Sequence, residues 1–106
     1  MINIEDFAKL DLRVGKILEV FDHPEADRLY VLKVSIGDKD IQILAGIKNY
    51  YGKDSLLGKE IIVITNLEPR KIRGLESQGM LLAAKDANGV FVLTPDKEVE
   101  PGSRVG

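Results

Sequence analysis

The segment "KNYYGKDSLLG", residues 48–58, decides which fold the sequence predicts. It interrupts an alternation of apolar and polar residues that runs on both sides of it, and it contains two glycines. Such a break predicts a short helical or irregular crossover. The number of strands on each side of this crossover therefore indicates the topology.

Three strands are predicted before the crossover. The first begins at Leu12 and is expected to bulge or bend at Gly15, since Leu12, Val14, Leu18 and Val20 share one phase and Ile17 takes the other. The turn "FDHPEADR", residues 21–28, separates it from the clearest strand, "RLYVLKVSIGD" at 28–38. The third strand carries Ile41, Ile43, Ala45 and Ile47 on one face.

Two strands are predicted after the crossover. The first is "EIIVITNL" at 60–67, and the second is "GMLLAAKD" at 79–86, with a long loop at 67–79 between them. The "DANG" turn and an added return strand, "VFVLT" at 90–94, follow. At the amino terminus, Ile4 to Leu10 predicts one or two helical turns with Asn3 as N-cap, packed as a lid.

Three strands, a short crossover and two more strands are the order of an OB-fold, a five-stranded, partly open Greek-key barrel in an all-β chain. An SH3-like barrel is the main competitor. The position of residues 48–58 between the third and fourth strands, together with the bent first strand, favours the OB-fold. Residues 1–106 are expected to form one domain.

Composition excludes several classes of protein. The chain has no cysteine, so it has no disulfides, thiolate metal site or cysteine nucleophile. It has no uncharged apolar run long enough for a membrane span and no signal-like amino terminus, so a soluble, cytoplasmic protein is expected. The formal charge of −2 argues against indiscriminate coating of nucleic acid.

The basic residues are nevertheless locally concentrated. Arg70, Lys71 and Arg73 occupy three of four consecutive positions in the 67–79 loop. In an OB-fold this loop and the 21–28 loop flank the face of strands two and three, where oligonucleotides and oligosaccharides bind. Arg28 is expected at the base of the first loop, and Lys33 on strand two is expected to project toward the same groove.

This loop has a functional and a structural interpretation. Ser77 and Gln78 add groups that can hydrogen-bond phosphate, sugar or bases, and engaging about four to six phosphates predicts a salt slope near −3 to −5. Alternatively, the cations form a solvated loop paired weakly with Glu68 and Glu76. The six aromatic residues are too few for a single-strand binder, so folded RNA read by shape is favoured.

Several stretches resemble one family over almost the whole chain. They are "DLRVGKI" (11–17), "HPEADRLYVLKV" (23–34), "NLEPRKIRGLESQGMLLA" (66–83) and "PGSRV" (101–105). They are similar to the tRNA-binding domain found in stand-alone tRNA-binding proteins and as the C-terminal part or β subunit of methionyl-tRNA synthetases. "LEPRKIRG" departs from the more common "LKPRKMRG" by carrying Glu68 in place of a lysine.

The resemblance implies a non-catalytic OB-fold homodimer that binds the outside corner of tRNA, alone or with a methionyl-tRNA synthetase catalytic subunit. By default Met80 and Leu81, with Tyr30, Phe21 and Phe91, belong to the core, but the resemblance moves Met80 to the rim. The expected tRNA-binding residues are Arg28, Lys33, Asn66, Arg70, Lys71, Arg73, Ser77, Gln78 and Met80.

Two rival functions remain. An enzyme is disfavoured because the only histidine, His23, precedes Pro24 in a turn, and because no zinc-ligand spacing or Gly-rich phosphate loop is present; no metal or cofactor is expected. The opening "IEDFAKLDLRVG" also resembles a secretion-associated chaperone built on this fold, which would hold unfolded polypeptide on an apolar surface.

Overall fold

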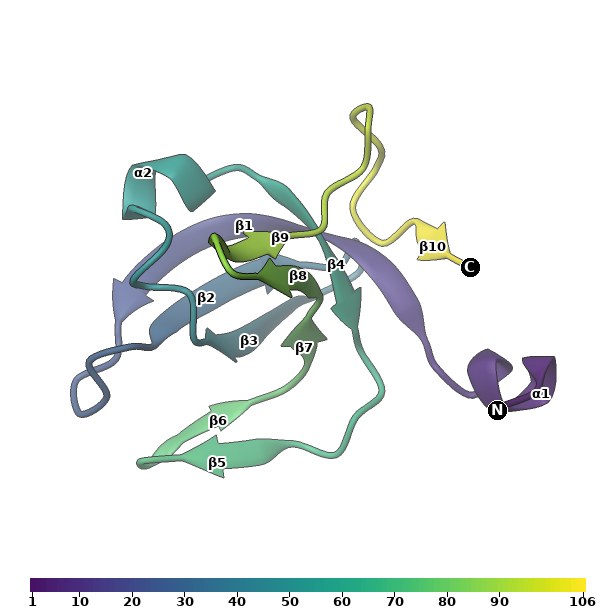
Figure 1. Ribbon diagram of the computed structural model, residues 1–106, viewed down its shortest axis with the longest axis horizontal. Helices are drawn as coiled ribbons and strands as arrows, with labels where there is room; N and C mark the ends of the chain where they lie inside the picture. The colour runs from purple at the N-terminus through teal and green to yellow at the C-terminus, as the bar shows by residue number, and fades with distance from the viewer.

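The computed structural model describes residues 1–106 and shows a barrel of the OB type (Figure 1). Its main sheet has the strand order β3-β2-β1-β4-β7. These strands are β1 (Leu12–Asp22), β2 (Tyr30–Ser35), β3 (Asp40–Ala45), β4 (Glu60–Ile64) and β7 (Met80–Leu81). Helix α2 (Lys53–Leu56) lies between β3 and β4, as the 48–58 segment predicted. The OB-fold prediction is confirmed.

Strand β1 belongs to both halves of the barrel. Its first half pairs with β4 from Leu12 to Lys16, and its second half pairs with β2 from Lys16 to Asp22. The bulge lies between Ile17 and Glu19, beyond the predicted position at Gly15. Ile17, just before the bulge, lies in the core and Leu18 is exposed, which corrects the predicted phase.

Gly15 has a different role from the predicted one. A Cβ atom at this position would lie 2.5 Å from Val34 Cγ1 and 3.1 Å from Val63 Cγ2. The side chains of β2 and β4 therefore close over the bare backbone of β1. Glycine is required here for close packing in the barrel and not for a bulge.

The core fills the inside of the barrel with aliphatic side chains. Alternation along β2 and β3 buries Tyr30, Leu32 and Val34 on one strand and Ile41, Ile43 and Ala45 on the next. Leu56 of α2 is fully buried and plugs one end. Burial of each Leu or Ile contributes roughly 1.5–3 kcal/mol, so this cluster dominates the stability of the barrel.

Both ends of the chain differ from prediction in detail. Helix α1 (Ile4–Ala8) has the predicted Asn3 cap, with a capping box to Asp6, but none of its residues is buried. It projects from the barrel (Figure 1), so the prediction that it packs as a lid is wrong. Strand β10 (Arg104–Val105) pairs with the start of β1 and brings the carboxyl terminus to the same side.

The predicted fifth strand is divided in two. Residues 80–81 form β7 against β4, whereas β8 (Ala83–Asp86) leaves the barrel and pairs with β9 (Gly89–Val92) across the predicted "DANG" turn. The division occurs at Leu82, whose N–H donates to Ile62 while its carbonyl accepts from Leu93. The predicted return strand therefore belongs to a separate hairpin.

Candidate nucleic-acid interface

The predicted 67–79 loop is a β-hairpin. Its strands are β5 (Arg70–Ile72) and β6 (Leu75–Ser77), joined by the two-residue turn Arg73-Gly74. Both turn residues have positive φ, 48° for Arg73 and 88° for Gly74, which is the geometry of a type I′ turn. This hairpin was not predicted from the sequence because each strand is only three residues long and because Arg-Gly is not one of the common two-residue turn pairs, such as Asn-Gly or Asp-Gly.

The base of the hairpin is fixed to the free edge of β3. Gln78 N–H donates to the carbonyl of Gln42 at 2.8 Å, and Gln42 N–H donates to Gln78 Oε1 at 2.7 Å. Gln42 Nε2 donates to the carbonyl of Glu76, and Leu44 N–H donates to Ser77 Oγ at 3.0 Å. These bonds form a seam, residues 42–44 against 76–78, that closes the barrel.

The tip of the hairpin is fixed to the β1–β2 loop. His23 is buried, its Nδ1 accepts from Glu25 N–H, and its Nε2 lies 3.0 Å from the carbonyl of Ile72. Because Nδ1 is an acceptor, Nε2 carries the proton and donates to Ile72. Arg73 Nη1 also donates to the carbonyl of Glu25 at 3.1 Å. We call these His23 and Arg73 contacts the latch.

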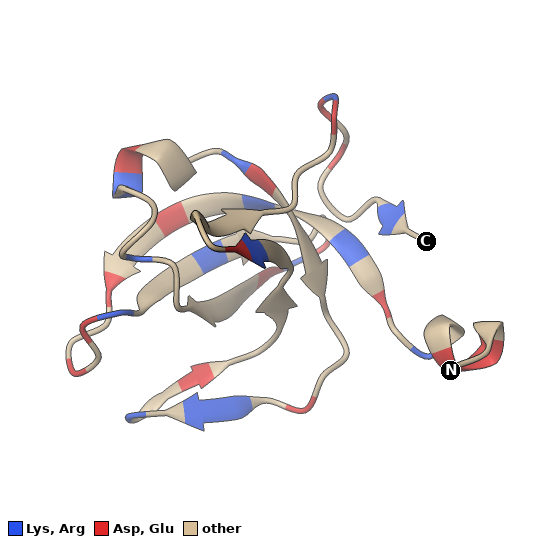
Figure 2. Cartoon of the chain, in the orientation of Figure 1, with Lys and Arg blue, Asp and Glu red and all other residues tan.

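The three cations of the hairpin have no carboxylate partner. None of Arg70, Lys71 and Arg73 forms an ion pair within 4.0 Å, so the expected weak pairing with Glu68 and Glu76 is absent. Strand alternation places Arg70 and Lys71 on opposite faces of the hairpin, whose basic residues stand out in Figure 2. Phosphates can therefore approach these cations without first displacing an acidic side chain.

A groove of about 330 Å³ lies on the outer face of β1, β2 and β3. Residues of two cross-strand rows line it, Glu19, Lys33 and Gln42 in one row and Phe21 and Val31 in the other, and Gln78 lines it from the seam. Lys33 is exposed, and its Nζ lies 3.8 Å from Asp40 Oδ2. Phe21 is 52% exposed, so the prediction that it belongs to the core is wrong, as it is for Phe91 at 49%; Tyr30 is buried as expected.

The other predicted residues have mixed positions. Met80 is 46% exposed and lies at the rim, with Leu81 half-buried beside it. Ser77 is buried, and its hydroxyl also donates to the Gly79 carbonyl. Asn66 lies away from the groove and ties β4 to the segment before β1, by donating to Lys9 and accepting from Asp11.

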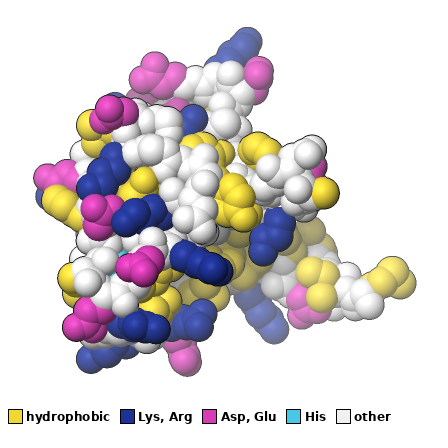
Figure 3. All heavy atoms as spheres, turned by 60° about the vertical axis from the view of Figure 1, so that its left-hand side comes forward, with side chains coloured by type: hydrophobic (Ala, Val, Ile, Leu, Met, Phe, Trp, Pro, Cys, Tyr) yellow, Lys and Arg dark blue, Asp and Glu magenta, His cyan; other side chains and the backbone are white.

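Arg28 is exposed at the end of the β1–β2 loop, and basic residues that the sequence analysis did not select lie near it. Lys53 and Lys48 each approach the carboxylate of Asp22 to 3.0 Å. The hydrogen bond from Lys53, followed by that from Lys48, holds the pKa of Asp22 below its usual value. Figure 3 shows dark-blue basic side chains on the forward face with acidic and apolar ones between them.

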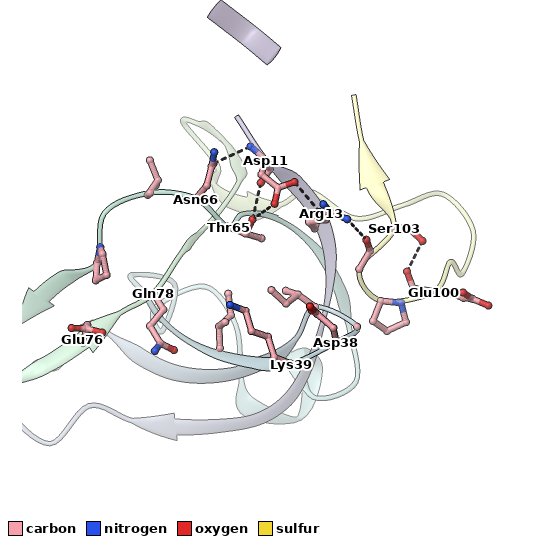
Figure 4. A pocket seen from close by; sticks show the side chains of 17 residues that line it. Asp11, Arg13, Asp38, Lys39, Thr65, Asn66, Glu76, Gln78, Glu100 and Ser103 are labelled. Atoms are coloured by element: carbon pink, nitrogen blue, oxygen red, sulfur yellow. Dashed lines mark hydrogen bonds and ion pairs between the residues drawn. The ribbon is translucent and has the colours of Figure 1, made fainter. Parts of the chain in front are cut away.

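A hollow of about 780 Å³ is a different site (Figure 4). It lies between the β2–β3 turn, the segment after β4 and residues 100–103. At one end Thr65 Oγ1 donates to Asp11 Oδ2 and Arg13 Nε donates to Oδ1, and the Thr65 bond in particular lowers the pKa of Asp11. Four acidic and two basic side chains line this hollow.

No group of three or more His, Cys, Asp or Glu side chains is arranged to hold a metal ion. No helix has the length and apolar character needed to cross a bilayer. The groove, the flanking β1–β2 loop and the cationic hairpin define a class of OB-type barrels that bind an extended ligand across β2 and β3.

The sequence places the chain within a particular family of such barrels. Residues 12–104 match the family model described as "Putative tRNA binding domain", and the chain belongs to that family. Methionine–tRNA ligases of Thermococcus onnurineus and Thermococcus kodakarensis are 59% and 60% identical to it over 104 residues. Those residues make up 98% of this chain but only 14% of either ligase.

Solved structures of similar size have the same fold. A protein related to methionyl-tRNA synthetase from Pyrococcus horikoshii superimposes with a TM-score of 0.93 at 32% identity, covering 100% of this chain and 98% of that one. The chaperone CsaA of Picrophilus torridus superimposes with a TM-score of 0.94 at 41% identity, covering both chains completely.

Proposed function

We propose that this domain binds tRNA across the groove on β2 and β3, with the β5–β6 hairpin supplying contacts to phosphates. The observation that carries the proposal is a hairpin with three unpaired cations, fixed at both ends beside an open groove. Such preorganisation lowers the entropy cost of binding. Family membership and the similarity to methionine–tRNA ligases support tRNA as the ligand.

The proposed tRNA-binding residues are those expected from the sequence, now with different roles. Arg28, Lys33, Arg70, Lys71, Arg73 and Met80 are exposed and contact tRNA directly. Ser77 and Gln78 hold the seam through their side chains, and Asn66 positions the segment that leads into the hairpin. Each of these three therefore acts at least partly by positioning.

A mobility-shift assay with total tRNA over a salt series tests the proposal. Replacing Arg70, Lys71 and Arg73 together with alanine is expected to weaken binding and to reduce the salt slope by up to about three. The matched control replaces Lys16, Lys85 and Lys97, which are exposed, lack ion pairs and lie outside the groove and hairpin. Equal affinities for the two triple variants would contradict the proposal.

We further propose that the domain is a single unit without catalytic activity that works in the cytoplasm. It acts alone or as the β subunit or tRNA-binding part of a methionyl-tRNA synthetase, and it forms a homodimer. The similarity to a small part of the ligases supports the link to a synthetase. Isolation of the endogenous protein and identification of a co-purifying synthetase catalytic subunit would test that partner.

A chaperone function is the second candidate, because the chaperone CsaA of Picrophilus torridus is 41% identical over the complete chain. The exposed Phe21, Phe91 and Leu57 offer apolar surface for an unfolded polypeptide. Suppression of aggregation of an unrelated unfolded protein, measured beside the tRNA titration, distinguishes the two functions. Suppression without any tRNA shift would favour the chaperone.

A further inference from the structure

The outer groove contains a combination of side chains suited to a single nucleobase. Phe21 is 52% exposed and lines this groove, so part of its apolar ring faces water in the free domain. Val31 and Leu44 lie beside it in the same cross-strand row, and Lys33 lies in the next row. Exposed aromatic rings provide stacking platforms for bases in proteins that bind nucleic acid. Lys33 Nζ lies 3.8 Å from Asp40 Oδ2, so the ring and not this cation is the feature that suits a base.

Two amides at the seam supply polar groups beside that ring. The Gln42 amide faces the carbonyl of Glu76, so it must present its NH₂ group there, and its Oε1 is left without a partner. The Gln78 amide faces the N–H of Gln42, so it must present its oxygen there, and its NH₂ group is left free. Both glutamines line the groove, and Gln78 also lines the hollow of Figure 4. The lining of the groove therefore includes one amide with a free acceptor and one with a free donor, and each amide is oriented by its bond to the backbone.

We infer that this groove binds one unstacked nucleobase of tRNA, which stacks on Phe21 while its edge hydrogen-bonds Gln42 Oε1 and Gln78 Nε2. The inference rests on the proposed tRNA-binding function and deepens it. The hairpin recognises the phosphate backbone, which carries no sequence information, whereas this groove contacts a base. The low aromatic content of the chain is compatible with this site, because one aromatic ring is enough to stack on one unpaired nucleotide of a folded RNA.

Replacement of Phe21 by leucine tests the stacking contact. Phe21→Leu keeps an apolar side chain on an exposed position but removes the aromatic face, so the fold should be retained. Base–aromatic stacking predicts that affinity for total tRNA falls roughly five- to a hundredfold, with no change in salt slope because no phosphate contact is lost. Phe91→Leu is the matched control, since Phe91 is exposed to a similar extent on β9 and does not line the groove.

A direct readout follows from the absence of tryptophan in the chain. Phe21→Trp introduces a single tryptophan that keeps the platform, so affinity should be retained and tRNA should quench its fluorescence. Phe91→Trp should not be quenched. Gln78→Glu keeps the oxygen that accepts from Gln42 N–H, removes the free donor and adds a negative charge. It is expected to weaken binding for both reasons while the unfolding transition stays unchanged.

The outcomes separate this inference from the function on which it rests. If the hairpin triple variant loses tRNA binding but Phe21→Leu binds with wild-type affinity, the base site is wrong and the tRNA-binding function stands. If Phe21→Leu lowers the salt slope, Phe21 acts on the cations and the stacking contact is also wrong. If the hairpin variant binds tRNA normally, the proposed function itself fails. Quenching of Phe21→Trp by an unfolded protein but not by tRNA would assign the groove to a polypeptide.

Discussion

Gly15 is a position in the barrel where only glycine fits without repacking. Its position against Val34 and Val63 leaves no room for a Cβ atom, and both neighbours are fully buried. Gly15→Ala is therefore expected to destabilise the fold by about 1–3 kcal/mol through overpacking, measured by urea unfolding.

Gly52→Ala provides the control for this prediction. Gly52 has a φ of −76°, and a Cβ atom added there would meet no other atom within 4 Å, so alanine should fit and change stability little. A loss of stability at Gly52 equal to that at Gly15 would show that the effect comes from the change of residue type and not from packing.

Asp11 is the residue that links stability to pH. Its hydrogen bond from Thr65 and its contact with Arg13 lower its pKa in the folded state. A group with a lowered folded pKa stabilises the fold above its unfolded pKa, about 3.9, and this contribution disappears as the pH falls through the folded pKa. The unfolding free energy of the wild type should therefore exceed that of Asp11→Asn at pH 7, and the difference should shrink as the pH falls below the unfolded pKa. A difference independent of pH would contradict this account.

At the scale of elements, the β5–β6 hairpin depends on the latch. His23→Asn retains an acceptor for Glu25 N–H but cannot reach Ile72, whereas His23→Gln retains a donor at the position of Nε2. Hydrogen exchange across residues 70–77 should accelerate in His23→Asn and be largely restored in His23→Gln, with β2 as an internal reference. Equal protection in both variants would mean that the Ile72 bond does not hold the hairpin.

Some of the secondary-structure elements could be predicted from the sequence and others could not. The crossover, β2, β3 and the Asn3 cap follow from local periodicity and capping, so they were predictable. The latch was not, because it joins His23 to Ile72 across 49 residues, and no local pattern reveals such a contact. The position of His23 before Pro24 indicated a turn, but neither its burial nor its two hydrogen bonds could be read from that turn. The exposure of Phe21 was missed because the bulge after Ile17 reverses the phase of β1.

The candidate site likewise has a part that could be predicted from the sequence and a part that could not. The cluster at residues 70–73 is visible in the sequence, and chain order places it beside the β1–β2 loop. The structural role of Ser77 and Gln78 could not be predicted, because no local pattern indicates that their side chains bond to β3 and close the barrel. The free donor and acceptor at the groove become apparent only once the partners of both amides are known.

At the scale of the molecule, both termini leave apolar surface on one side. Met1, Ile2 and Ile4 are at least 72% exposed, and β10 pairs with the adjoining start of β1. If the proposed homodimer forms through these segments, sedimentation should show a dimer for the wild type and a monomer for Ile4→Asp. Leu57→Asp, which changes a similarly exposed side chain after α2, should remain dimeric. A wild-type monomer at micromolar concentration would refute the dimer.

The seam is expected to be the place where the barrel opens most easily. Four hydrogen bonds join residues 42–44 to residues 76–78, and three of them involve a side chain, whereas β1 and β2 are joined by a backbone ladder. Under a stretching force, or during thermal fluctuations, the barrel should part first between β3 and the hairpin and stay whole elsewhere. A ligand that contacts both sides of this line would hold them together. The force needed to open the barrel should then rise with the fraction of domains that have ligand bound.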